Sequence, residues 1–125
     1  MYDQPEAREL VAAVRDFLER HAMPALEGHA AFHARVAANA LAIVERQLEL
    51  GPADEAAERQ RLRALLGLDG SLDELNRELC RRIRSGAFGS GTEGVMDHLR
   101  KTTLGKLAVD QPRYSGYRRA LERGE

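Results

Sequence analysis

Three histidines near the N-terminus have a spacing that could support metal chemistry. His29 and His33 are four residues apart, so in a helix their rings share one face. His21 lies one short connection earlier, and in an antiparallel pair of helices all three rings would meet at the same end. Three imidazoles with an open coordination position form a known zinc geometry. Because the sequence holds neither His-Glu-x-x-His nor Glu-x-x-His, ordinary histidines at helix ends are the simpler interpretation.

Arg35 and Asn39 lie in a stretch that is otherwise small or apolar, AAFHARVAANALAIV, residues 30–44. On a helical wheel Asn39 falls inside the apolar arc and Arg35 stands at its edge. The first hypothesis is structural: Arg35 pairs with a carboxylate of another helix, and a buried Asn39 sets the register. The second hypothesis is a clamp in which both side chains bind a carboxylate or a phosphate.

Two further motifs carry weaker signals. Residues 89–94, GSGTEG, match the G-x-G-x-x-G pattern of nucleotide-binding loops, but that pattern requires a preceding strand, and here a helical segment precedes it. A helix boundary, with Ser90 or Thr92 as the cap and Glu93 as its partner, explains these residues better. Cys80 borders an apolar stripe and is interpreted as a small buried hydrophobe. No catalytic residue is predicted.

The segments that must position these residues are predicted to be helical. No β-branched run alternates with polar residues, and aromatic residues make up only 5% of the chain. The residues Asp3-Gln4-Pro5-Glu6 supply a cap and an early proline for a first helix that reaches about Ala22. Pro24 is expected to end it.

The second helix is predicted to be the central one. It follows Gly28 and runs to Leu50, and the Gly51-Pro52 pair predicts a break after it. Apolar or small residues cover more than half of its circumference, and a helix of this kind sits among neighbouring helices.

Three more helical segments follow the predicted break. The residues Ser71-Leu72-Asp73-Glu74 form a capping box, and behind it Leu72, Leu75, Leu79 and Ile83 make a narrow apolar stripe. The segments expected are 53–66, 72–85 and 92–109, the last with Val95, Met96, Leu99, Thr103 and Leu107 facing inward, and then a docked tail over 114–123. We therefore expect a single all-α domain over residues 1–125, a bundle of about five helices.

Composition excludes several functional classes. A formal net charge of -1 argues against a nucleic-acid scaffold, and no apolar run is long enough for a membrane span. The short basic clusters around Arg82 and Arg118 are expected to form ion pairs on solvated helix faces. The single cysteine and the lack of a signal segment favour a cytoplasmic location, and no cofactor is predicted.

Three segments together resemble a known family. They are YDQPEARELVAAVRDFL, HARVAANALAIVERQLELG and KLAVDQPRYSGYRRAL, and they span nearly the whole chain. The family is a set of small, uncharacterised bacterial helical proteins, a domain of unknown function. The resemblance implies genes encoded beside aminoglycoside-phosphotransferase-like kinases and acyl-CoA dehydrogenases, but it implies no functional residue.

The leading hypothesis is a non-enzymatic accessory or interaction protein of such a kinase and dehydrogenase system, acting as a homodimer. It rests on the missing catalytic constellation and on a second helix whose apolar arc exceeds what one small bundle covers. The alternative is a small enzyme or ligand-binding protein that uses Arg35 and Asn39, or His21, His29 and His33, on an acyl or phosphoryl group.

Overall fold

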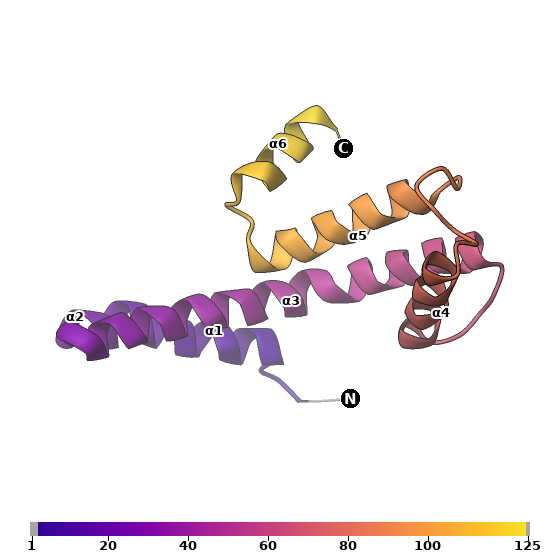
Figure 1. Ribbon diagram of the computed structural model, residues 1–125. Helices are drawn as coiled ribbons and strands as arrows, with labels where there is room; N and C mark the ends of the chain where they lie inside the picture. The colour runs from indigo at the N-terminus through magenta and orange to yellow at the C-terminus, as the bar shows by residue number, and fades with distance from the viewer. Residues whose placement is uncertain (1–2, 125) are drawn as a thin grey trace. The chain divides into compact units, whose positions relative to one another are not determined.

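The computed structural model describes residues 3–124, and every regular element within them is a helix (Figure 1). The predicted all-α fold of about five helices is therefore confirmed for this part of the chain. Contacts between residues divide the chain into two compact units, with the boundary after Gly51. The single domain expected over residues 1–125 stays a prediction. None of the described helices is long and apolar enough to cross a bilayer.

The first helix, α1, spans Ala7–Phe17 and begins later than its sequence signals indicated. Its N-cap is Glu6, whose backbone N–H donates to the carboxylate of Glu9 at 2.8 Å. An acid three residues after the cap satisfies one of the N–H groups that a helix start leaves without a partner. The predicted cap at Asp3 was therefore placed too early.

Pro24 does not end the first helical segment, contrary to the sequence prediction. A π-helical turn, η1 (Leu18–Ala22), follows α1, and α2 (Met23–Ala25) follows in turn with Pro24 in its first turn. Pro24 thus lies inside a continuous helical path, in which the Met23 N–H donates to the Leu18 carbonyl five residues earlier, as in a π-helix. The helical path ends at Leu26, which is extended.

The helix α3 spans Gly28–Leu66 and continues through Pro52, so the predicted break at Gly51-Pro52 is wrong. A proline inside a helix loses one backbone hydrogen bond and crowds the carbonyl four residues earlier. The residues on both sides are good helix formers, and the Gly-Pro pair has no polar side chain beside it that would cap a new helix start. A single continuous helix therefore replaces the second and third predicted helices.

In the second unit, the core lies between the end of α3 and α4 (Leu72–Arg84). The predicted capping box is confirmed: Glu74 N–H donates to the Ser71 hydroxyl at 3.1 Å, and Ser71 N–H donates to the Glu74 carboxylate at 2.9 Å. The apolar stripe is buried at its centre and exposed at Ile83. The buried cluster consists of Leu62, Leu66, Leu75 and Leu79, with Leu65, Leu72 and Phe88 packed against it.

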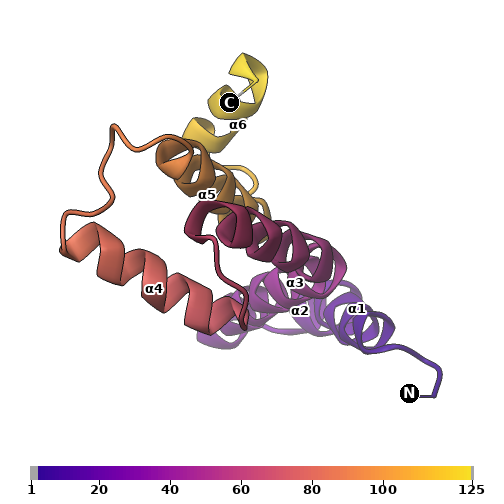
Figure 2. The same cartoon turned by 90° about the vertical axis from the view of Figure 1, so that its right-hand side faces the viewer.

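Two more helices complete the second unit: α5 (Val95–Asp110) and α6 (Ser115–Arg123). Figure 2 shows α4 and α5 as separate rods, joined by the loop that contains the glycine motif. The cap of α5 is Gly94, whose φ of 85° is left-handed and favours glycine, so the caps predicted at Ser90 or Thr92 were misplaced. The inward face predicted for α5 is only partly correct, since Val95 is buried while Met96 and Leu99 are exposed.

Candidate functional site

In the first unit, α1 and α3 form an antiparallel hairpin with a seam of small residues. Ala34 and Ala38 of α3 are buried, with exposures of 8% and 2%. Small side chains allow two helix backbones to approach closely. Larger apolar residues are half-buried in the same unit, namely Val11, Leu18, Leu41 and Ile43. The apolar arc predicted to be covered on this helix is exposed at Phe32, Val36, Val44 and Leu48, whereas its members Leu41 and Ile43 are half-buried.

Two ion pairs join the helices of the hairpin. Arg15 Nε donates to Glu45 Oε2 at 2.7 Å, and Arg8 lies 3.4 Å from Glu49. The hydrogen bond from Arg15 holds the pKa of Glu45 below its ordinary value. The ion pair between helices that the sequence suggested for Arg35 is thus made by Arg15.

The side of the hairpin away from these ion pairs is apolar and exposed. Val14 and Val44 each precede a member of the Arg15–Glu45 pair. One step back rotates a side chain by about 100° around its own helix, and because the two helices are antiparallel, both valines turn to the same side. The stripe continues along both helices, and we call its exposed members the hairpin apolar face: Leu10 (54%), Val14 (52%), Phe17 (58%), Val44 (40%) and Leu48 (40%).

Arg35 and Asn39 are exposed on α3. The structural hypothesis required a buried Asn39, and that part of it is wrong: the wheel placed Asn39 among apolar residues, but that side of α3 is not covered within the unit. Phe32 and Val36, which neighbour them on the helix, are exposed as well, at 58% and 47%. The clamp hypothesis stays a prediction.

The three histidines are exposed. The ring of His21 lies 6.1 Å from that of Phe17, and the ring of His33 lies 5.5 Å from that of Phe32. In the described part of the chain, no three or more His, Cys, Asp or Glu side chains are grouped closely enough to hold a metal ion. The structure therefore does not bring His21, His29 and His33 together.

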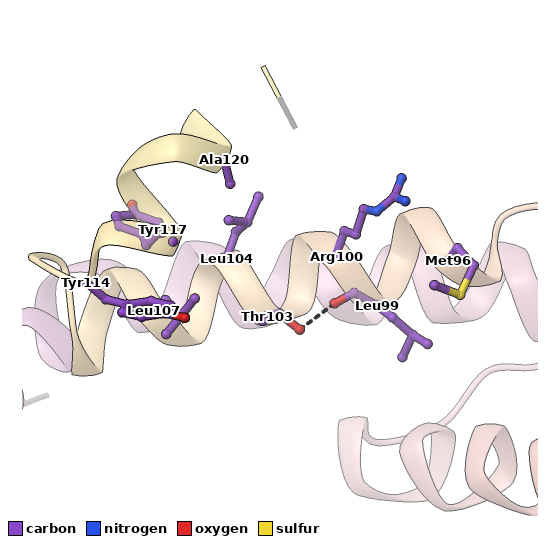
Figure 3. A pocket seen from close by; sticks show the side chains of 10 residues that line it. Met96, Leu99, Arg100, Thr103, Leu104, Leu107, Tyr114, Tyr117 and Ala120 are labelled. Carbon is purple, nitrogen blue, oxygen red and sulfur yellow. Dashed lines mark hydrogen bonds between the residues drawn. The ribbon is translucent and has the colours of Figure 1, made fainter. Parts of the chain in front are cut away.

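An apolar groove of about 400 Å³ lies in the second unit, between α5 and α6 (Figure 3). Tyr117 and Ala120 of α6 lie over Leu104 of α5, and Arg100 rises from α5 one turn before it. The ring of Tyr114 lies so close to Gly116 that a Cβ on Gly116 would come within 3.0 Å of it. A groove of this volume falls in the range usual for small-molecule sites.

The side of α5 that faces α3 carries a polar cluster. His98 is 3% exposed, and its Nδ1 accepts a hydrogen bond from Arg61 Nε at 3.3 Å. The same guanidinium donates to the Thr102 hydroxyl at 3.2 Å. Burial lowers the pKa of His98, and the nearby charge of Arg61 lowers it further. This imidazole is shielded from solvent, and its hydrogen bond to Arg61 joins α5 to α3.

The remaining motifs have structural roles or none. Within the glycine loop, residues 89–94, the Gly89 N–H donates a hydrogen bond to the Thr92 hydroxyl at 2.9 Å. Cys80 is exposed, so the prediction that it is buried is wrong. The basic cluster on α4 forms the expected surface pairs, and the hydrogen bonds from Arg81 and Arg82 lower the pKa of Glu78 to about 2.

Comparison with known proteins identifies the family. Residues 24–114 match the family described as Domain of unknown function (DUF6285). The chain belongs to this family. No similarity to a curated protein or to a solved structure was found.

The DUF6285 match covers only part of each candidate surface. It includes α3, α4 and α5, whereas α1, which supplies half of the hairpin apolar face, precedes it. The helix α6, which covers the groove, follows it. Sequence reasoning missed the groove, and the available signal was α5 itself, which carries apolar residues on two opposite sides.

Proposed function

We propose that this chain is an accessory protein without catalysis of its own, which acts by binding another protein through the hairpin apolar face. One observation supports the proposal most directly: large apolar side chains on both helices are 40–58% exposed, although Ala34 and Ala38 of α3 are buried. Monomeric soluble proteins rarely expose a continuous apolar patch of this kind, and such patches usually mark interaction surfaces.

The occupant we propose for this face is a second copy of the chain. Apolar residues of α1 and α3 lie at similar levels along the axis of the hairpin. Two hairpins related by a two-fold axis can therefore pack face to face as a four-helix bundle. The charged pairs Arg15–Glu45 and Arg8–Glu49 lie away from the stripe, so association would not remove them from water.

The resemblance extends this proposal to a pathway. A phosphotransferase-like kinase or an acyl-CoA dehydrogenase would be the further partner of the dimer. This partnership is supported only by the gene neighbourhood that the resemblance implies, so it requires a separate test. The test is co-purification with each candidate partner, with the dimer present in all samples.

The test of self-association compares two nearby positions on α1. Val14→Lys places a charge in the hairpin apolar face, whereas Asp16→Lys places a lysine at an exposed position on the other side of the helix. Light scattering after size exclusion is expected to give a dimer for the wild type and Asp16→Lys, and a monomer for Val14→Lys with unchanged helix content. A wild-type monomer at tens of micromolar, a range typical of weak association, would remove the second copy as the occupant.

A ligand-binding function is the second candidate, supported by the exposure of Arg35 and Asn39 one turn apart on α3. An arginine and an amide at this spacing can together bind a carboxylate or a phosphate. The histidine cluster belongs to the same alternative and would require an altered arrangement of the hairpin. Calorimetric titration with inorganic phosphate and with zinc, on the wild type and Arg35→Ala, distinguishes the two sites.

A further inference from the structure

We infer that the groove between α5 and α6 binds an aliphatic chain that ends in a carboxylate, with the chain along Leu104 and Leu107 and the carboxylate at Arg100. This inference is independent of self-association, because the groove and the hairpin apolar face belong to different units of the chain.

The groove exists because α5 has two apolar sides. One side packs within the unit: Val95 and His98 are buried, and a Cβ on Gly105 would overlap the carboxylate of Asp54 on α3. The opposite side, with Met96, Leu104 and Leu107, is covered only in part by α6 (Figure 3). Burying such side chains against a ligand is favourable by roughly 25 cal/mol for each Å² removed from water.

The dimensions of the groove suit a chain of medium length. Arg100 and Leu107 are seven positions apart on α5, which corresponds to roughly 10 Å at 1.5 Å per residue. That distance matches an extended chain of about eight carbons, and the groove volume of about 400 Å³ holds it with room for water at the head.

The polar groups of the groove select the charge of the ligand. Within the described part of the chain, Arg100 is the one charged residue that lines it. The neighbouring acid, Asp97, is engaged by Lys101 at 2.9 Å, and the hydroxyl of Thr103 donates to the Leu99 carbonyl at 2.8 Å. A guanidinium at the edge of an apolar groove favours a planar anion such as a carboxylate.

The experiment uses three probes with the same chain and different heads: octanoate, octan-1-ol and octylammonium. Titrations followed by the NMR signals of the Met96 and leucine methyl groups should show saturable binding. The affinity should be highest for octanoate, lower for octanol and lowest for octylammonium. Arg100→Gln should lower the affinity for octanoate about fivefold and leave the affinity for octanol unchanged, because only the charge-assisted contact is lost. Leu104→Gln should lower the affinity for octanoate and for octanol to a similar extent.

Two control variants show whether octanoate binds in the groove or at another surface of the chain. Lys106→Gln removes a cation from the same helix outside the groove lining and should bind octanoate like the wild type. Val14→Lys should also bind octanoate normally, and loss of binding in that variant would assign the ligand to the hairpin apolar face and overturn the inference. Absence of saturable shifts at Met96, or octanol binding as tightly as octanoate, would overturn it too.

Discussion

Arg15 and Glu45 link two helices across thirty positions of sequence, and they do so with two hydrogen bonds. Arg15 Nε lies 2.7 Å from Glu45 Oε2, and a terminal guanidinium nitrogen lies 3.4 Å from Oε1. Both side chains are partly shielded, with exposures of 30% and 21%. The pair therefore sets the register of the hairpin, and with it the alignment of the apolar residues on its other side.

The first prediction concerns the pH dependence of this pair. The pKa of Glu45 is lowered in the folded chain, so its stabilisation is present above the ordinary value of 4.5 and is lost as the pH falls through the lower folded value. At pH 7, Glu45→Gln should reduce the free energy of unfolding by about 0.5–1 kcal/mol, and the difference should shrink at pH 3. Urea unfolding at both pH values measures this, with Glu55→Gln as an exposed control. A deficit of equal size at both pH values would contradict it.

The second prediction concerns His98. Its pKa is lowered by burial and by Arg61, so the unfolded chain binds a proton more readily than the folded one. Stability should therefore fall as the pH drops below about 6.5, and the fall should end below the folded pKa. His98→Gln should remove this pH dependence, whereas His29→Gln, at an exposed position, should retain it. Chemical denaturation between pH 5 and 8 provides the measurement, and an NMR titration of the His98 ring gives the folded pKa directly.

The third prediction concerns the core between α3 and α4. Leu62 is 0% exposed and Leu75 2%, so truncating either removes apolar contacts and leaves a cavity. Leu62→Ala should lower the free energy of unfolding by about 2–5 kcal/mol. Leu68→Ala, at a position that is 47% exposed, should cost much less. Comparable losses in the two variants, measured by urea unfolding, would show that this cluster is not the core.

The fourth prediction concerns Arg35 and Asn39. Since both side chains are exposed, Arg35→Ala and Asn39→Ala should each change stability by less than about 0.5 kcal/mol. A buried amide would instead cost about 1–3 kcal/mol when its partners are left unsatisfied. Thermal melting of the two variants distinguishes these outcomes. A large destabilisation that persists in the monomeric Val14→Lys background would show that Asn39 is buried within the chain.

Local signals predicted some helix boundaries and failed at others. The Ser71 capping box and the end of α5 before Pro112 depend on side chains within a few residues, and both were readable. Pro52 was misjudged because its effect depends on competition between one lost hydrogen bond and the helix on both sides. The burial predicted for Cys80 was wrong because a residue at the edge of an apolar stripe can be either buried or exposed, and the sequence pattern does not distinguish the two.

By itself, the sequence determined the helical class and the residues that share each helix face, because these follow from composition and from a period of about 3.6 residues. Only the tertiary structure decided which faces are covered. On α3 the seam formed at Ala34 and Ala38, and on α5 at Val95 and His98, and large apolar side chains were left exposed elsewhere on both helices. Periodicity cannot choose between two apolar faces of one helix. That choice depends on close approach of backbones and on ion pairs such as Arg15–Glu45, which join residues far apart in the chain.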